Sequence, residues 1–235
     1  MTQLALTIDR PTTMPPVRLG GSQWARDRAG GGFEPTSAVR AVGPVQYFTR
    51  DRDIYGEGED AALFFKVVSG VVRTCKFRSD GRRQIDSFHF AGDLFGLEAG
   101  SEHSLCAEAV CDCAVVSYRR RGLETLAESD GALSRQIFSF AMRSLARSQK
   151  HALLLGCGTA VEKVAAFLVE LAAAAPESTA IALAMTRQDI ADYLGLTMET
   201  VSRTLSRFER DCLIELPTAR QVWIKNLAAL RNLGR

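Results

Sequence analysis

Apolar positions in residues 185–208 recur at helical spacing and are interrupted once, at Gly195. After the glycine, Val201, Leu205 and Phe208 follow one another at i, i+4 and i+7. Residues spaced in this way share one face of a helix and are buried together. The pattern predicts two short helices joined by a tight turn at the glycine, which tolerates a positive φ.

Start signals accompany both predicted helices. Thr186 followed by Asp189 fits a capping box, and Thr197 is a favourable N-cap for the second helix. The polar face of the second helix carries Glu199, Ser202, Arg203 and Ser206. An acceptor, a hydroxyl and a guanidinium near a helix start suit the reading of base edges in the major groove. The alternative is an ordinary helical hairpin with a solvated polar face.

Residues 199–203, Glu-Thr-Val-Ser-Arg, resemble the Glu-x-x-Ser-Arg signature of the FNR and FixK branches of the CRP/FNR superfamily of bacterial transcription regulators. The resemblance extends from about Val45 to the C-terminus. It implies that the second helix reads half-sites related to TTGAT, and the side chains suit that task. The residues expected to contact DNA are Arg187, Thr197, Glu199, Ser202, Arg203, Ser206 and Arg207.

Residues 45–121 consist of short alternating or apolar runs separated by turn residues, which is typical of a β-sandwich or small barrel. The runs include 62–68, 71–77, 84–90 and 114–118. The resemblance implies a β-roll of the cyclic-nucleotide-binding type, in which the loop Gly92–Gly96 would lie near a ligand phosphate. The expected fold class is therefore α+β, with an N-terminal β-roll, a long dimerisation helix and a C-terminal winged helix-turn-helix.

Four segments are expected along the chain. Residues 1–44, rich in proline and glycine, predict a disordered leader. The β-roll follows at 45–121, a linker and dimerisation helix at 122–157, and the winged helix-turn-helix domain at 158–235. Within the last segment, a helix from Thr159 to about Ala174 ends before Pro176, and a two-stranded wing is expected at 213–224. The sequence Gly156-Cys157-Gly158 is expected to be the hinge between the last two segments.

A long helix at about 131–155 carries a narrow apolar stripe, which favours a contact between two copies of the chain. The stripe consists of Leu133, Ile137, Phe140 or Ala141, Leu145, Ala152 and Leu155. Packing of this helix against its own β-roll is the alternative. The resemblance implies a homodimer, and the expected interface residues are Ile137, Phe140, Ala141, Ser144, Ser148 and Leu155. Ser148 occupies the position at which FNR carries an acid that makes dimerisation conditional. A serine costs less there than an unpaired charge, which indicates a dimer without a co-effector.

Cyclic AMP is not expected to bind, because the Arg-Ser pair that holds the nucleotide phosphate in cyclic-AMP receptors is matched here by His103-Ser104. The acid expected after the glycine loop is displaced by Leu97, and His103 is interpreted as a surface histidine. Three histidines, only two of them in the β-region, argue against a metal-dependent cupin-like enzyme. The chain is therefore expected not to be an enzyme.

Six cysteines are present, but none lies in the first 74 residues, where FNR has most of its iron–sulfur ligands. An iron–sulfur cluster is therefore not expected, and neither is another metal. Cys111 and Cys113 are expected on one side of a strand as small core residues. Cys157 and Cys212 are the candidates for redox sensitivity.

The composition is that of a globular protein, with a net charge of only +2 over 235 residues. Cations and anions are equal in number from Gly158 onward, so DNA binding must depend on local clustering of charge. Without a bilayer-spanning run or a signal peptide, we expect a cytoplasmic protein with no membrane partner. The expected partners are double-stranded DNA, a second copy of the chain, and RNA polymerase through the hairpin around Arg78–Arg82.

The resemblance thus implies a FixK-like activator of microaerobic, denitrification or nitrogen-fixation genes. Two alternatives remain open within the sequence. One is a sensor of the same superfamily that depends on haem or another ligand in the β-roll. The other is a regulatory module that binds cyclic nucleotide without acting on DNA.

Overall fold

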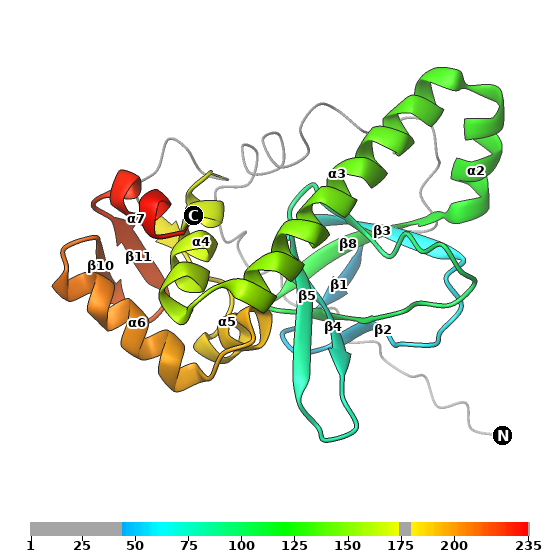
Figure 1. Cartoon of the computed structure of the whole chain (residues 1–235). Coiled ribbons are helices and arrows are strands. Elements are labelled where there is room, and N and C mark those ends of the chain that lie inside the picture. The colour runs from blue at the N-terminus through cyan, green and yellow to red at the C-terminus, as the bar shows by residue number, and fades with distance from the viewer. Residues whose placement is uncertain (1–43, 174–179, 235) are drawn as a thin grey trace, which may run out of the picture.

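The computed structural model describes residues 44–173 and 180–234, and the expected leader and Pro176 lie outside these residues. A β-rich N-terminal part and a helical C-terminal part are connected by one long helix, α3 (Gly131–Cys157), which runs diagonally across the molecule (Figure 1). Within the described residues, no helix combines the length and apolarity needed to cross a bilayer.

The N-terminal part consists of two four-stranded antiparallel sheets with the orders β1-β8-β3-β6 and β2-β7-β4-β5. The strands are β1 (Gln46–Phe48), β2 (Asp53–Tyr55), β3 (Leu63–Ser69), β4 (Val71–Phe77), β5 (Arg83–Phe90), β6 (Leu94–Phe95), β7 (Cys106–Ala109) and β8 (Cys113–Arg119). Inward-facing side chains of both sheets, among them Phe65, Val72 and Val115, form a common core. The predicted β-roll and its four named runs are confirmed by these strands.

Helix α2 (Arg120–Ser129) follows the last strand, and a single residue, Asp130, separates it from α3. The Asp130 carboxylate caps α3 by accepting hydrogen bonds from the N–H groups of Ala132 and Leu133, at 2.8 and 3.1 Å. The helix continues through Cys157, and the chain becomes extended at Gly158. The expected three-residue hinge was therefore too wide, since Gly156 and Cys157 belong to the last turn of the helix.

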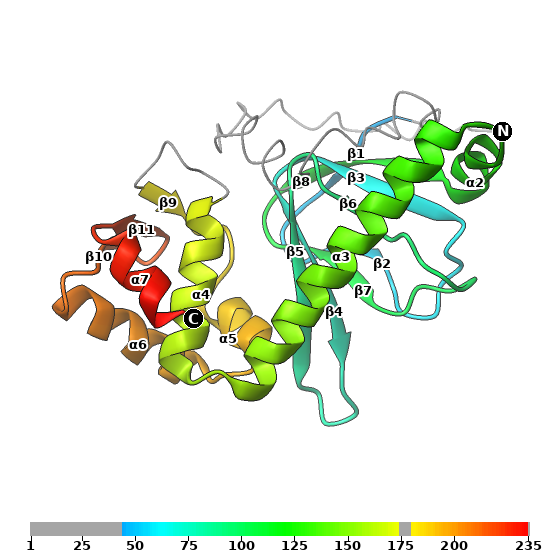
Figure 2. The ribbon, with the colours of Figure 1, turned by 45° about the horizontal axis from the view of Figure 1, so that its top comes forward.

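The C-terminal part contains α4 (Ala160–Ala173), α5 (Arg187–Leu194), α6 (Met198–Arg210) and α7 (Leu227–Leu233). A three-stranded sheet of order β10-β11-β9 completes it, from β9 (Ala180–Ala182), β10 (Ile214–Thr218) and β11 (Gln221–Ile224). The predicted wing corresponds to β10 and β11, and the expected helix at 159–174 to α4. Figure 2 shows this part at one end of α3, with α5 between α6 and the β-roll.

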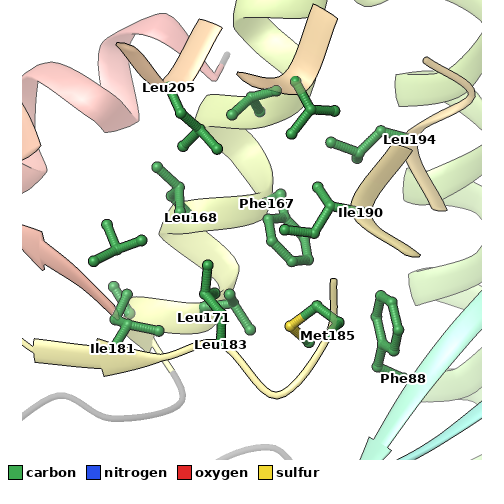
Figure 3. Close-up of a cluster of buried hydrophobic side chains, with 14 of the residues drawn as sticks. Phe88, Phe167, Leu168, Leu171, Ile181, Leu183, Met185, Ile190, Leu194 and Leu205 are labelled. Carbon is green, nitrogen blue, oxygen red and sulfur yellow. The ribbon is translucent and has the colours of Figure 1, made fainter. Parts of the chain in front are cut away.

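The apolar core of the C-terminal part extends into the β-roll. Leu168, Ile190 and Leu205, from three different helices, converge in its centre (Figure 3). Phe88 of β5 enters the same cluster from the roll, with its ring centroid 6.5 Å from that of Phe167 and 5.3 Å from that of Tyr193. The two parts of the molecule therefore share buried apolar surface and do not meet only through α3.

Candidate nucleic-acid interface

Helices α5 and α6 form the predicted pair, and local hydrogen bonds fix where each begins. The Thr186 hydroxyl accepts from the Asp189 N–H at 3.0 Å, and the Asp189 carboxylate accepts from the Thr186 N–H at 2.8 Å. This reciprocal pair is the predicted capping box. Gly195 ends α5 in the left-handed region, with φ of 61°. The Thr197 hydroxyl then caps α6 by accepting from the Thr200 N–H at 3.1 Å.

Helix α6 separates its apolar and polar residues onto opposite faces. Val201, Leu205 and Phe208 are buried in the shared core, as the spacing predicted. The opposite face is solvent-exposed and carries Glu199, Ser202, Arg203, Ser206 and Arg207. Five of the seven residues expected to contact DNA are thus brought together on one open helical surface, and Thr197 stands at its N-terminal end.

Interactions along α6 arrange the polar face in the absence of DNA. Glu199 and Arg203 form an ion pair one turn apart, and the Ser202 hydroxyl donates to the Met198 carbonyl at 2.9 Å. A guanidinium has five N–H donors in a planar fork, so the bond to Glu199 leaves donors for a base edge. Both side chains are largely exposed, so the ion pair contributes about 1 kcal/mol or less.

Arg187, the seventh expected residue, has a different environment. It lies half-buried at the start of α5, and its Nη1 has no hydrogen-bond partner among the described residues. Burial lowers the pKa of Arg187, and the neighbouring Arg220 lowers it further. Arg220 in turn donates to the Ala184 carbonyl at 2.5 Å. A phosphate group would relieve the repulsion between the two arginines, so a contact from Arg187 to DNA stays a prediction.

Two different apolar faces run along α3. Ile137 and Phe140 are partly buried against a cluster of the chain's own β-roll that includes Leu133. Of the other expected interface residues, Ser144 and Ser148 line a cleft of about 380 Å³ between α3 and β5, Ala141 is exposed and Leu155 is partly buried. The large exposed apolar side chains of the helix are Phe138, Met142, Leu145 and Leu153.

The expected interface residues do not all lie on one side of α3. Successive residues turn by roughly 100° around a helix axis, so Phe138 and Leu145 lie about a quarter turn or more from Ile137 and Phe140. The expected stripe includes Ile137 and Phe140, which contact the roll, and Leu145, which is exposed. Which of these residues meet a second chain stays a prediction. We use the name exposed α3 face for Phe138, Met142, Leu145 and Leu153.

Comparison with known proteins places the chain in a family. Residues 162–233 match the model of the Crp-like helix-turn-helix domain, and residues 45–130 match the model of the cyclic nucleotide-binding domain. The chain is 45% identical over 204 residues to the nitrogen fixation regulation protein FixK of Azorhizobium caulinodans, covering 85% of this chain and 82% of that one. It belongs to the CRP/FNR family of transcription regulators, in the FixK-like group.

Two further relatives agree with this assignment. FixK of Rhizobium meliloti is 41% identical over 202 residues, which cover 86% of this chain and 91% of that one. The structure of FixK2 from Bradyrhizobium japonicum superposes with a TM-score of 0.78 at 42% identity, covering 83% of this chain and 98% of that one. Such coverage includes both the β-roll and the helix-turn-helix domain of this regulator.

In this CRP/FNR regulator, aromatic rings surround His103, the residue that matches the phosphate-binding arginine of cyclic-AMP receptors. His103 is 3% exposed and stacks on Tyr55, with ring centroids 3.6 Å apart. A Cβ on Gly96 would lie 3.2–3.3 Å from Phe65, His103 and Tyr55. His103 is thus a buried core residue, and its interpretation as a surface histidine was wrong. Its imidazole cannot provide the planar fork by which an arginine binds phosphate.

The acid of the glycine loop is present one residue later than expected. Glu98 accepts hydrogen bonds from the N–H and the hydroxyl of Ser104, at 3.2 and 3.0 Å. His103 Nδ1 lies 3.8 Å from the same carboxylate, too far for a hydrogen bond. Ser104 and Glu98 therefore bind each other within the loop.

The cysteines divide into buried and exposed groups. Burial raises the pKa of Cys75 and of Cys113 to about 12, whereas Cys157 and Cys212 are exposed. Cys111 lies before β8 and packs with the core shared by both parts, while Cys113 packs inside the roll. The expectation that the two point to one side of a strand was therefore wrong. Across the described residues, no group of three or more His, Cys, Asp or Glu side chains could hold a metal ion.

An ion cluster between the two parts of the molecule was missed by sequence reasoning. Arg73 of β4 and Arg83 of β5 meet Glu108 of β7 and two acids of α5, Asp189 and Asp192. Asp189 was identified only as the capping acid of α5. No local pattern could have indicated its arginine partners, which are 116 and 106 residues away in the sequence.

Proposed function

We propose that the chain acts as a homodimer that binds palindromic DNA of the FNR/FixK type, with TTGAT-related half-sites, and activates transcription. The observation that carries this proposal is the open polar face of α6, where Glu199, Ser202 and Arg203 stand exposed on a helix with a buried opposite face. Arg203 is suited to a guanine edge and Glu199 to a cytosine amino group, while Ser202 can contact thymine. The exposed α3 face is the proposed dimer contact.

The decisive measurement is DNA binding by the protein purified aerobically without nucleotide or iron. A labelled TTGAT-N4-ATCAA duplex is titrated by fluorescence anisotropy, with a scrambled duplex of the same composition as competitor. Preferential binding to the palindrome is expected. Equal affinity for both duplexes would refute the proposal.

Substitutions on α6 test how the palindrome is read. Arg203→Ala is expected to lose about 1–3 kcal/mol on the palindrome and far less on scrambled DNA, because a bidentate base contact is specific. Glu199→Ala is expected to relax the preference at one base pair. Arg231→Ala, which removes a surface cation from α7, is the matched control and should behave as wild type. Unchanged discrimination in both α6 variants would exclude this reading of the helix.

Effector independence is part of the proposal. The ring stack at His103 and the pairing of Ser104 with Glu98 support a roll that binds no cyclic nucleotide. We also propose that no iron–sulfur cluster is required, since the sequence before residue 75 offers no cysteine ligand. Addition of cyclic AMP, or reconstitution with iron and sulfide, should leave the affinity for the palindrome unchanged.

RNA polymerase is the proposed protein partner, and the hairpin between β4 and β5 is its proposed contact. Arg82 at this hairpin is held by an exposed ion pair with Asp80 at 2.6 Å, and Phe77 beside it is 48% exposed. Arg78→Ala combined with Arg82→Ala should reduce transcription from a FixK-type promoter in vitro without weakening DNA binding. The relatives' names include nitrogen fixation regulation, and genes of nitrogen fixation or microaerobic growth are the proposed targets.

A further inference from the structure

The ion cluster joins the β-roll to the first helix of the DNA-binding pair. Arg73 Nε lies 2.6 Å from Glu108 within the roll, and its Nη1 lies 3.1 Å from Asp189 of α5. Arg83 Nη2 lies 2.6 Å from the same Asp189 oxygen and 2.9 Å from Asp192, one turn further along α5. Both views of the ribbon place α5 beside β5 (Figures 1 and 2).

Asp189 uses its two carboxylate oxygens for different purposes. Oδ2 accepts from the N–H and hydroxyl of Thr186, at 2.8 and 2.7 Å, and so caps α5. Oδ1 accepts from Arg73 and Arg83 of the roll. Burial opposes ionisation of this carboxyl, but the bonds from Thr186 and the two guanidinium groups outweigh burial and lower its pKa. The start of α5 is therefore attached to the roll by a charged group that stays ionised.

The cluster is almost closed to solvent. The side chains of Arg73, Glu108 and Asp189 are 5%, 9% and 4% exposed. Buried ion pairs contribute little net stability, because desolvation offsets their attraction, but they penalise every arrangement that leaves a charge unpaired. A rotation of α5 away from β5 would cost Asp189 both of its arginine partners, while Arg73 would keep Glu108 and Asp51. The cluster thus favours one orientation of the helix pair relative to the roll.

The orientation of α5 fixes that of α6. The turn between the two helices is short, ends in the left-handed Gly195 and leads directly into the Thr197 cap. Ile190 and Leu194 of α5 pack in the same buried core as Val201 of α6. With the cluster in place, the polar face of α6 remains exposed, so this orientation is compatible with DNA binding and does not block it.

We propose that Arg73 and Arg83 are positioning residues for DNA binding, which hold the recognition helix at the orientation that a palindromic site requires. The proposal rests on the proposed function as a dimeric DNA-binding protein. A dimer must present two recognition helices one DNA turn apart. Fixing each helix-turn-helix on its roll removes the cost of ordering it when DNA binds, and a regulator held in this way needs no effector to align its domains.

The test compares a full palindrome with a single half-site. Arg83 and Asp192 form the more exposed ion pair of the cluster. Arg83→Gln and Asp192→Asn each remove the charge of one partner. Each is expected to lose about tenfold in affinity for the palindrome, because the second half-site is no longer presented in register, with less than about a threefold change on an isolated half-site. Because Arg83 also binds Asp189, Arg83→Gln is expected to lose at least as much as Asp192→Asn, and the double variant should lose little more than Arg83→Gln.

Lys76→Gln is the matched control. It removes a cation from β4, the strand that carries Arg73, and its partner Glu57, at 2.8 Å, belongs to the same roll. This variant should bind both DNA sites as wild type. Sedimentation and thermal melting first establish that each variant is folded and dimeric. If Arg83→Gln does not fold, Asp192→Asn carries the test.

Different failures are separable. If wild type does not prefer the palindrome, the proposed function is wrong. If wild type prefers it but both cluster variants keep wild-type affinity for it, the positioning proposal is wrong. A loss of equal size on palindrome and half-site would also overturn it, because that result indicates local damage to the recognition helix. Losses that simply add in the double variant would show that Arg83 and Asp192 do not act together.

Discussion

Replacing Leu145 with aspartate tests whether the exposed α3 face is the dimer contact. Leu145 is 49% exposed in the single chain and lies on the exposed α3 face. Full burial of a leucine is worth about 1.5–3 kcal/mol, so covering its exposed half contributes about 1 kcal/mol per copy. A carboxylate left unpaired in the contact costs about 1–3 kcal/mol more per copy. For two copies the dimer loses about 4 kcal/mol or more, which is roughly a thousandfold in its dissociation constant.

Sedimentation equilibrium over a wide concentration range measures this change directly. Gln136→Asp, at an exposed position of α3 about half a turn from Leu145, adds the same charge and should leave the dimer intact. Ser148→Asp, at the edge of the cleft beside β5, should weaken the dimer less than Leu145→Asp. A dimer that survives Leu145→Asp but dissociates with Ser148→Asp would refute the exposed α3 face as the dimer contact and would place the contact at Ser148.

Three other changes have defined outcomes. Cys157 and Cys212 are exposed and should react with a thiol reagent in the native protein. A peroxide-induced loss of DNA binding should disappear when both cysteines are replaced by serine. Full sensitivity to peroxide in that double variant would exclude both cysteines. Burial lowers the pKa of His103, so the unfolded chain binds more protons and the free energy of unfolding should fall as pH drops below about 6.5. His103→Phe should flatten this fall in urea titrations, and an unchanged slope would contradict the assignment. Gly195→Ala places a side chain at φ of 61° and should lower thermal stability by about 1–2 kcal/mol, whereas a neutral effect would show that the turn can relax.

Local sequence patterns were sufficient to predict the helix-turn-helix. The capping signals at Thr186 and Thr197 and the spacing of Val201, Leu205 and Phe208 depend on residues within one helix and its flanks, and the structure has the same caps and buried face. The strands of the roll were predictable for the same reason, because turn residues separate short apolar runs.

Features that depend on distant residues could not be obtained in this way. Helix α3 carries apolar residues on two faces, and periodicity alone cannot tell which face covers the roll and which is open. The residues on either side of His103, Glu102 and Ser104, are polar and do not indicate burial, and Tyr55, on which it stacks, is 48 positions earlier. The cluster of Arg73 and Asp189 joins strands and a helix that only the folded chain brings together.

The insertion of Phe88 into the core of the helical domain also limits how this chain can be recombined. A DNA-binding fragment that begins after Gly158 would lose Phe88 from its hydrophobic core, and its Asp189 would lose both arginine partners. Grafting such a module onto the sensory half of a relative therefore requires Arg73, Arg83 and Phe88 to be transferred with it. In this regulator the chain passes from one domain to the other at Gly158, but the hydrophobic core continues across that point. Substitutions in one domain at this contact therefore require matching substitutions in the other.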